Sequence, residues 1–246
     1  MIHKTALIDE GVKIGRGVKI EPFSIIHKGV NIGDHSHIGP YSELGIDNSK
    51  ASNSELIIGK YAKILGRANL YLGSRIGDNL MIGHDVTIRE NSKIGEGVQF
   101  GNRSDIQGDL EVGDFTKTHA DVHIGKMTKI GRFCWIFPSC LFTNDPNPPS
   151  NNLVGSIIED FVVIMSGTII LPGVTIKKNA VIGACSKVGS DIEEGKFAQG
   201  NPAKTFFNAS ELPLIGDINK KAYPWQERFS RGYPESILKK WRSQEE

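Results

Sequence analysis

The chain has 246 residues, with 29 Lys and Arg against 28 Asp and Glu, so its formal net charge is +1. This balance argues against a dedicated nucleic-acid binder or a binder of anionic membranes, because both need an excess of basic residues. No stretch approaches the roughly 20 apolar residues of a membrane-spanning helix. The first residues also lack the apolar centre of a signal peptide, so we expect a cytoplasmic protein with no membrane span.

The three cysteines, Cys134, Cys140 and Cys185, are odd in number and form no CxxC motif. This usage argues against a disulfide framework and against a structural zinc ribbon. The chain also contains 28 Gly, together with 31 Ile against only 14 Leu. An excess of isoleucine with abundant glycine favours strands and tight corners over helices.

A large apolar residue recurs every six positions along most of the chain. The register runs from Ile2 to Leu44, from Ile58 to Phe142, and from Ile158 to Val188. Of its 29 positions 28 are hydrophobic, Thr118 is the exception, and Gly follows directly at 14 of them. A period of six is neither helical nor a simple strand alternation. It indicates a short strand followed by a sharp corner, repeated so that stacked coils bury a column of isoleucine side chains.

With this repeat the sequence resembles the hexapeptide-repeat acyltransferases over roughly residues 2–204. The resemblance implies an all-β fold, a left-handed parallel β-helix of triangular cross-section, which we assign to a domain of residues 1–204. It also implies a homotrimer with active sites between neighbouring subunits. A solenoid filled with isoleucine has no interior cavity, so its chemistry must use outer faces, loops or clefts between subunits.

Two polar insertions interrupt the repeat, near residues 45–57 and at residues 143–157. The second is rich in Pro and Asn, which excludes a ladder strand, and loops that leave a rigid scaffold often carry function. After residue 204 the repeat ends, and residues 205–246 form a predicted C-terminal helical extension. Pro234 stands near the start of its helix, and we expect this extension to cap the open end of the solenoid.

The end of the repeat resembles the donor-binding end of the coenzyme A-dependent members. The pieces ILPGV (170–174), IGACS (182–186) and GNPAK (200–204) carry this resemblance. It implies that acetyl-CoA is the co-substrate and that a narrow channel holds its thioester arm, with a basic residue at its phosphates. The residues that match by position are Ser166, Gly167, Ala184 and Lys204. A thioester arm needs small walls and exposed amides, and phosphates need a cation.

Acyl transfer also needs a base for the acceptor, and histidine is the usual one. His119 follows the polar exception in the register and is our first candidate, with His84 as the second. The segment IGHDVTI around His84 resembles a turn of the nucleotide-sugar acyltransferases in which a neighbouring carboxylate supports the histidine. Counting repeats places His84 and His119 on the same edge of the prism. His123 is assigned to substrate binding.

The loop start CLFTNDPNPP resembles the branch that acetylates amino groups of nucleotide-linked sugars. Sugar O-acetyltransferases of this superfamily carry a histidine before the proline, where this chain has Asp145. Asn144 and Asp145 are therefore assigned to binding the acceptor ammonium or orienting the sugar. An Asx-turn that opens a proline-rich loop is the structural alternative for both residues.

The sequence thus predicts a coenzyme A-dependent acetyl transfer to the amino group of a nucleotide-linked amino sugar, without a metal. The alternative within this class is O-acyl transfer to a sugar hydroxyl, which needs a stronger base. Two alternatives of other classes remain open. One is a protein like the γ-type zinc carbonic anhydrases, which bind metal through three histidines. The other is a non-catalytic trimeric scaffold.

Overall fold

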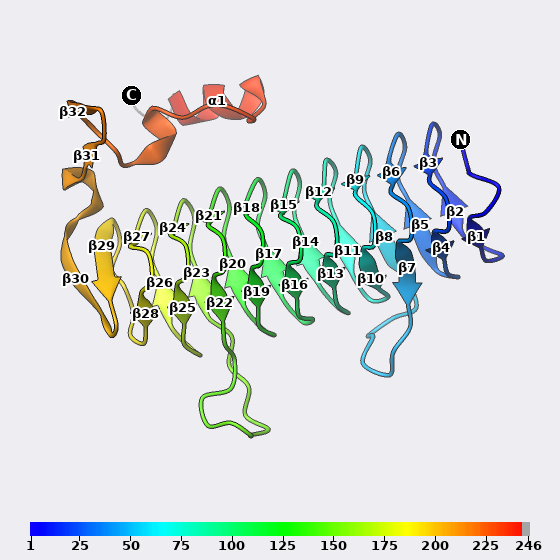
Figure 1. Ribbon diagram of the computed structural model, residues 1–246, viewed down its shortest axis with the longest axis horizontal. Helices are drawn as coiled ribbons and strands as arrows, with labels where there is room; N and C mark the ends of the chain where they lie inside the picture. Colours follow the sequence, from blue (N-terminus) through cyan, green and yellow to red (C-terminus); the bar gives the residue numbers. More distant parts are fainter. Residues whose placement is uncertain (243–246) are drawn as a thin grey trace.

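The computed structural model describes residues 1–242 of the chain. Residues 243–246, the last part of the predicted extension, lie outside the described residues. The chain winds through about 11 turns of a parallel β-solenoid, in which three short strands form each turn (Figure 1). The expected all-β parallel β-helix with a short C-terminal helix is confirmed. No helix in the described part of the chain is long and apolar enough to cross a bilayer.

Three sheets form the faces of the solenoid, and we call them sheets A, B and C. Sheet A has 11 strands, and all of them are parallel except the last. The strands of sheet A are β3 (Lys19–Ile20), β6 (His37–Ile38), β9 (Lys63–Ile64), β12 (Met81–Ile82), β15 (Gln99–Phe100), β18 (Lys117–Thr118), β21 (Trp135–Ile136), β24 (Val163–Ile164), β27 (Val181–Ile182), β29 (Lys196–Gly200) and β30 (Ala203–Asn208).

Sheets B and C have ten and nine strands. Those of sheet B are β1 (Leu7–Ile8), β4 (Ile25–Ile26), β7 (Glu43–Ile46), β10 (Asn69–Tyr71), β13 (Thr87–Ile88), β16 (Asp105–Ile106), β19 (His123–Ile124), β22 (Leu141–Phe142), β25 (Ile169–Ile170) and β28 (Lys187–Val188). Those of sheet C are β2 (Lys13–Ile14), β5 (Val30–Ile32), β8 (Leu56–Ile58), β11 (Arg75–Ile76), β14 (Lys93–Ile94), β17 (Glu111–Val112), β20 (Lys129–Ile130), β23 (Ile157–Ile158) and β26 (Thr175–Ile176).

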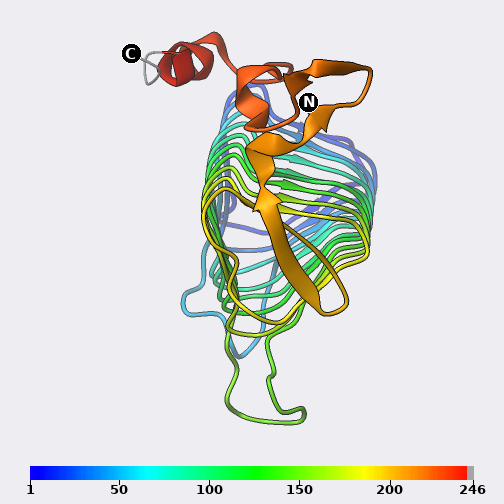
Figure 2. The ribbon, with the colours of Figure 1, turned by 90° about the vertical axis from the view of Figure 1, so that its left-hand side faces the viewer.

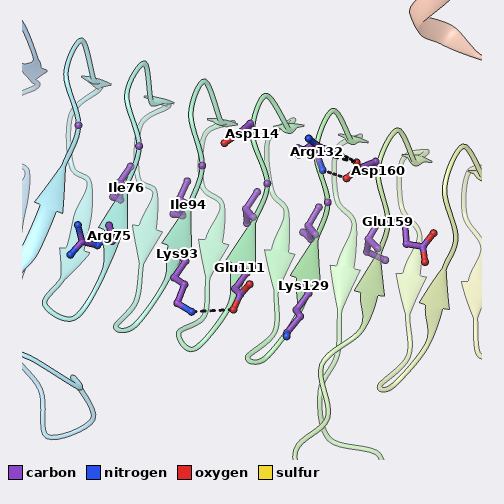
Figure 3. Close-up of a pocket in the computed structure, with 18 of the residues that line it drawn as sticks. Arg75, Ile76, Lys93, Ile94, Glu111, Asp114, Lys129, Arg132, Glu159 and Asp160 are labelled. Carbon is purple, nitrogen blue, oxygen red and sulfur yellow. Dashed lines mark hydrogen bonds and ion pairs between the residues drawn. The ribbon is translucent and has the colours of Figure 1, made fainter. Parts of the chain in front are cut away.

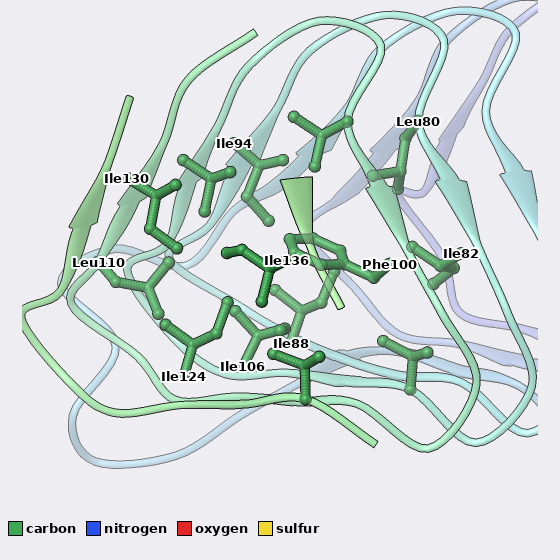
Figure 4. Close-up of a cluster of buried hydrophobic side chains, with 14 of the residues drawn as sticks. Leu80, Ile82, Ile88, Ile94, Phe100, Ile106, Leu110, Ile124, Ile130 and Ile136 are labelled. Carbon is green, nitrogen blue, oxygen red and sulfur yellow. The ribbon is translucent and has the colours of Figure 1, made fainter. Parts of the chain in front are cut away.

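The six-residue register points inward, as the sequence predicts. From Ile20 to Val188 every register position is buried. Figure 4 shows part of this core, with Ile82, Ile106 and Ile136 among the labelled side chains. The glycines that follow the register have a steric reason: a Cβ on Gly101 would lie 2.3 Å from the carbonyl carbon of His119 in the next coil. Cys134 and Cys140 are buried free thiols in this interior, and burial raises their pKa values to about 12 and about 11. Buried thiols of this kind are inert.

Both insertions leave the solenoid where the chain turns from sheet B into sheet C. One lies between β7 and β8, the other between β22 and β23, and both project from the same edge of the solenoid (Figure 1). The first loop is fastened to a later coil, because Asn48 donates a hydrogen bond to the carboxylate of Glu90 at 2.8 Å. Glu90 is fully buried and also bonds to Arg89 and Lys126.

The C-terminal segment does not form the expected helical cap over the open end. Strand β29 and the antiparallel β30 extend sheet A past β27 instead, at the end that faces the viewer in Figure 2. A proposed domain boundary at residue 204 would fall inside β30. The chain then forms a 3-10 turn at Ala209–Glu211, the hairpin of β31 (Pro213–Leu214) and β32 (Asp217–Lys221), a 3-10 turn at Trp225–Glu227, and helix α1 (Glu235–Arg242).

This segment, residues 209–242, runs back over the solenoid, and we call it the strap (Figure 1). Its apolar residues pack on outward-facing side chains of the late coils rather than on the core. The two sets share one buried cluster, made of Phe115, Phe133, Val163, Val181, Ala209, Trp225, Tyr233 and Leu238. Because outward apolar side chains gain stability only when something covers them, the strap follows sheet A and not the open end.

Candidate active site along one edge of the solenoid

The edge where the chain turns from sheet A into sheet B, which we call the A–B edge, collects most of the predicted site residues. His84 follows β12 and His119 follows β18, so both histidines lie on this edge as the repeat count predicts. Residues after β24 and β27 continue the same edge, and they include Ser166, Gly167 and Ala184. The edge therefore carries the two candidate bases and the predicted donor-binding wall in one row.

His119 is exposed, and aromatic neighbours fix its orientation. Its imidazole stacks on Phe137 with ring centroids 4.8 Å apart, and the Trp135 ring lies at 6.2 Å. One face of the imidazole is thereby covered, while the rest of the ring stays accessible to solvent. A ring that is both held and accessible suits proton transfer to and from a bound substrate.

His84 is also exposed, but the carboxylate next to it has another partner. Asp85 forms a two-pronged ion pair with Arg67, at 2.5 and 2.8 Å. The hydrogen bond from Arg67 is the main reason that the pKa of Asp85 lies below its usual value. The Asp85 carboxylate, which the resemblance pairs with His84, therefore pairs with Arg67 instead.

His123 lies on the outer face of sheet B and not on the A–B edge. Its Nδ1 is 3.0 Å from the carboxylate of Asp105, to which Gln107 donates a second bond at 2.7 Å. The hydrogen bond with His123 is the main cause that lowers the pKa of Asp105. Sequence reasoning missed Asp105 as a partner, although the 18-residue separation of the two residues is one coil and was available as a signal. An imidazole oriented by a carboxylate is a typical general-base arrangement.

Asn144 and Asp145 lie on a different edge, at the start of the loop between sheets B and C. The Asp145 carboxylate accepts bonds from the Ser150 hydroxyl at 2.7 Å, from the Ser150 amide at 2.7 Å and from the Asn147 amide at 3.0 Å. The bond from the Ser150 hydroxyl is the main cause that lowers the pKa of this carboxylate. The Asn144 carbonyl accepts the Val154 amide at 2.8 Å and closes the neck of the loop. Asp145 thus forms the Asx-turn that the structural alternative predicts, and Asn144 contributes to the loop through its main-chain carbonyl.

The predicted donor-binding residues form the late part of the A–B edge. Ser166 and Ala184 are exposed, and Gly167 takes a positive φ of 72°. Because β18, β21 and β24 are consecutive in sheet A, Ser166 lies two coils beyond His119, roughly 10 Å at the usual strand spacing. Lys204 is exposed on β30, at the end of the same sheet.

A wide groove on the outer face of sheet C lies apart from all of these residues. Its volume is about 990 Å³, and ladders of stacked charged side chains line it, with Lys93 and Glu111 3.3 Å apart (Figure 3). None of the predicted site residues lines this groove. Within residues 1–242, no group of three His, Cys, Asp or Glu side chains is arranged to hold a metal ion.

Comparison with known families agrees with the repeat. A family model described as bacterial transferase hexapeptide (six repeats) matches residues 11–45 and 155–190. These two matched segments are thus similar in sequence to the hexapeptide repeats of bacterial transferases. A 2,3,4,5-tetrahydropyridine-2,6-dicarboxylate N-acetyltransferase of Staphylococcus aureus is 42% identical to this chain over 65 residues. That match spans 26% of this chain and 26% of the relative, about a quarter of each.

Two solved structures illustrate the range of similarity to this chain. An Arabidopsis UDP-N-acetylglucosamine acyltransferase has a TM-score of 0.46 and 19% identity, covering 85% of this chain and 74% of its own. A Vibrio cholerae hexapeptide-repeat acetyltransferase, solved with acetyl coenzyme A, has a TM-score of 0.39 and 20% identity, covering 53% and 71%.

Proposed function

We propose that this protein is a coenzyme A-dependent acyltransferase that moves an acetyl group from acetyl-CoA to the amino group of a nucleotide-linked amino sugar. The observation that carries the proposal is the A–B edge. His119, with an accessible imidazole, stands on the same edge as the exposed Ser166 and Ala184 and the half-buried Gly167, which follow two and three coils further along. In our proposal this strip of small residues takes the thioester arm.

In this scheme the neutral acceptor amine attacks the thioester carbonyl carbon directly. A C–N bond forms, the carbonyl oxygen becomes an oxyanion, and main-chain amides of the edge stabilise it. His119 removes one proton from the nitrogen. The C–S bond then breaks, and the coenzyme A sulfur leaves and takes a proton to become the free thiol. The scheme needs no covalent enzyme intermediate, and Cys134 and Cys140 are buried with raised pKa values.

We propose roles for the other predicted residues as well. Lys204 holds the phosphates of coenzyme A, because it is an exposed cation at the donor end of the edge. His123, Asn144 and Asp145 line the acceptor side across sheet B. We also propose a homotrimer, in which a neighbouring subunit closes the edge into a cleft, since an open edge alone does not exclude water. The cytoplasmic location stays a prediction.

O-acyl transfer to a sugar hydroxyl is the second candidate, and the His123–Asp105 pair favours it. A hydroxyl needs a stronger base than a neutral amine, and a carboxylate behind an imidazole provides one. The two candidates therefore use different histidines.

A screen of nucleotide-linked amino sugars with acetyl-CoA, following release of free thiol, tests the proposal. We expect thiol release with an amino sugar, and a loss of at least about tenfold in kcat for His119→Ala. His35→Ala is the matched control, because His35 is an exposed corner histidine that also stacks on an aromatic ring, Tyr61, at 5.4 Å. Absence of thiol release with every acceptor would reject acyl transfer. A tenfold loss of kcat in His123→Ala, with an unchanged kcat in His119→Ala, would reject His119 as the base.

A further inference from the structure

Ring contacts on the side of the later coils orient the imidazole of His119. Phe137, at the equivalent position of the next coil, stacks on it at 4.8 Å with planes 20° apart, and the Trp135 ring lies at 6.2 Å with planes 41° apart. The equivalent position of the preceding coil is Gly101, which has no side chain to hold the imidazole. The orientation of this exposed ring therefore depends on how firmly Phe137 and Trp135 are themselves held.

Trp135 lies on the outer face of sheet A, where the strap covers it with aromatic residues. Phe229 and Trp225 meet it edge to face, with ring centroids 5.6 and 6.2 Å away. The hydroxyl oxygen of Tyr233 accepts a hydrogen bond from the indole N–H of Trp135 at 2.9 Å. Apolar ring contacts tolerate rotation, whereas a hydrogen bond fixes the direction in which the indole nitrogen points. The bond to Tyr233 thus selects one orientation of the Trp135 ring.

Tyr233 is a rigid anchor for this bond. It is only 7% exposed, its ring faces the Lys117 ammonium at 4.1 Å, and Trp241 of α1 meets it at 4.9 Å. Burial raises the pKa of its phenol well above the usual value, so the hydroxyl stays neutral. An indole N–H can only donate, so the Tyr233 oxygen is the acceptor that Trp135 needs in this buried layer.

We propose that Tyr233 is a positioning residue for His119, through which the strap holds the imidazole in one orientation. Tyr233 fixes the Trp135 ring, and the Trp135 ring lies against both His119 and Phe137, at 6.2 and 6.3 Å. The proposal rests on the proposed function for the role of the imidazole as the base. Because proton transfer requires a correctly placed base, an imidazole that samples several orientations lowers kcat without weakening substrate binding.

Tyr233→Phe tests the proposal, because it removes the hydroxyl and keeps the ring that packs on Lys117. We expect kcat to fall about fivefold, the effect of one buried hydrogen bond, with an unchanged KM for both substrates. Tyr223→Phe is the matched control. Tyr223 is also a strap tyrosine whose pKa is raised by burial, but the single indole N–H of Trp135 is bonded to Tyr233. Equal kcat values for the two variants would overturn the proposal.

A double-mutant cycle separates positioning of the base from a general loosening of the strap. Trp135→Phe removes the donor of the hydrogen bond, so adding Tyr233→Phe to it should lower kcat no further. If the two losses multiplied in the double variant instead, Tyr233 would act on kcat by a route that does not pass through Trp135, and the proposal would be wrong.

NMR of the histidine ring protons measures the orientation of the imidazole without any turnover. A proton close to the face of an aromatic ring is shifted by the ring current, so the His119 signals report how the imidazole lies on Phe137. His119→Ala identifies these signals among those of the seven histidines. We expect Tyr233→Phe to move them toward the shifts of a histidine without a stacked ring, and Tyr223→Phe to leave them in place.

The two measurements distinguish this inference from the proposed function. Moved His119 signals in Tyr233→Phe, with no thiol release from any acceptor, would support the positioning of the imidazole by the strap and reject the proposed function. Unmoved His119 signals in Tyr233→Phe, with thiol release at an unchanged kcat, would reject the positioning and keep the proposed function.

Discussion

The ammonium group of Lys117 lies 4.1 Å from the centre of the Tyr233 ring, which belongs to the strap. The centre of the Trp135 ring is 5.1 Å from the same ammonium, and the Gly232 carbonyl accepts a bond from it at 3.5 Å. Lys117 is only 5% exposed, although it points outward from sheet A. The strap thus covers a solenoid lysine with an aromatic ring and a carbonyl, and its ammonium is largely removed from water.

This contact makes strap docking depend on pH. Burial, with a smaller contribution from the charge of Arg231, holds the pKa of Lys117 below its ordinary value of 10.5. The folded chain therefore binds fewer protons than the unfolded chain as pH rises toward 10.5, so the folded state gains stability over that range. The buried thiols of Cys134 and Cys140 lower stability over the same range in any variant, since burial raises their pKa values. We therefore expect the melting temperature of Lys117→Met to fall relative to that of the unchanged protein between about pH 8 and 10.

Lys63→Met is the control for this pH dependence, because Lys63 is an exposed residue at the equivalent outward position of sheet A. It should leave the pH profile unchanged. The measurements stay below about pH 10, because Tyr233 affects stability above that pH. Burial raises the pKa of Tyr233, so the stability that its neutral hydroxyl contributes is lost as pH rises through about 10. If the melting temperatures of Lys117→Met and Lys63→Met depended on pH in the same way, Lys117 would not be the source of the pH dependence.

The six-residue register was sufficient to predict the solenoid, because one inward side chain per corner decides whether stacked coils close around a dry core. The places of both loops followed from breaks in the same register. The strap could not be placed in this way, since its path depends on which outer face offers apolar partners. A signal for that face was present: Trp135, Val163 and Val181 stand at outward positions where earlier strands of sheet A carry Lys63 or Gln99.

For the candidate site, the sequence also predicted the positions of residues better than their contacts. Residues that share an edge are fixed by counting, so His84 and His119 were placed together. Hydrogen-bond partners are not fixed by counting, since they depend on the rotamer that each side chain adopts between competing neighbours. Asp85 therefore pairs with Arg67 rather than supporting His84, and Asp145 closes its own loop.

A column of phenylalanine side chains along another edge gives a second prediction. Phe115, Phe133 and Phe161 stack with centroids 5.6 and 4.9 Å apart, and Trp241 of α1 meets Phe133 at 5.1 Å. We expect Phe133→Ala to lower the free energy of unfolding by about 3 kcal/mol, because it removes a buried ring beneath the strap. Limited proteolysis should then cut the strap sooner.

Phe23→Ala is a matched control for that substitution. Phe23 is also a corner residue with a φ of 59° and also stacks on a ring, Tyr41 at 5.1 Å, but it is 51% exposed and no strap covers it. Phe23→Ala should lower the free energy of unfolding by about 1 kcal/mol, which is the contribution of one aromatic pair. Chemical denaturation measures both, and equal losses would show that the strap adds nothing to the stability of the column.

The single polar residue in the register predicts a stabilising substitution. Thr118 is 6% exposed, and its hydroxyl has no hydrogen-bond partner among the residues described. Thr118→Val keeps the shape and removes the unpaired group, so we expect a gain of about 1 kcal/mol in the free energy of unfolding. Thr116→Val is the matched control in the same coil. The Thr116 hydroxyl donates to the Gly131 carbonyl at 2.7 Å and accepts the Cys134 amide at 3.0 Å, so its removal should cost about 2 kcal/mol.

The buried carboxylate of Glu90 predicts an acid-sensitive loop. Burial opposes its ionisation, but hydrogen bonds, first among them the bond from Asn48, outweigh burial and lower the pKa to about 2 from 4.5. The stability that Glu90 contributes is therefore complete above pH 4.5 and is lost as pH falls toward 2. Glu90→Gln should cost about 1–3 kcal/mol at neutral pH and flatten this acid limb.

Glu90→Gln should also loosen the loop that Asn48 fastens, so trypsin should cleave faster after Lys50. The control is Glu111→Gln, since Glu111 is an exposed residue that pairs with Lys93 at 3.3 Å. Exposed pairs of this kind contribute roughly 0–1 kcal/mol, so stability and cleavage should stay close to those of the unchanged protein. Equal acid profiles in both variants would exclude Glu90 as the tether.

The donor end of the A–B edge gives the last prediction, which depends on the proposed function. If Lys204 binds the phosphates of coenzyme A, Lys204→Gln should raise the Kd for coenzyme A by about tenfold, the loss of one charge-assisted bond. The affinity of the variant should also respond less to added salt, because one ionic contact is gone. Lys187→Gln on β28, an exposed lysine on sheet B, should change neither quantity. Calorimetry at two salt concentrations measures both, and an unchanged Kd in Lys204→Gln would place the phosphates elsewhere.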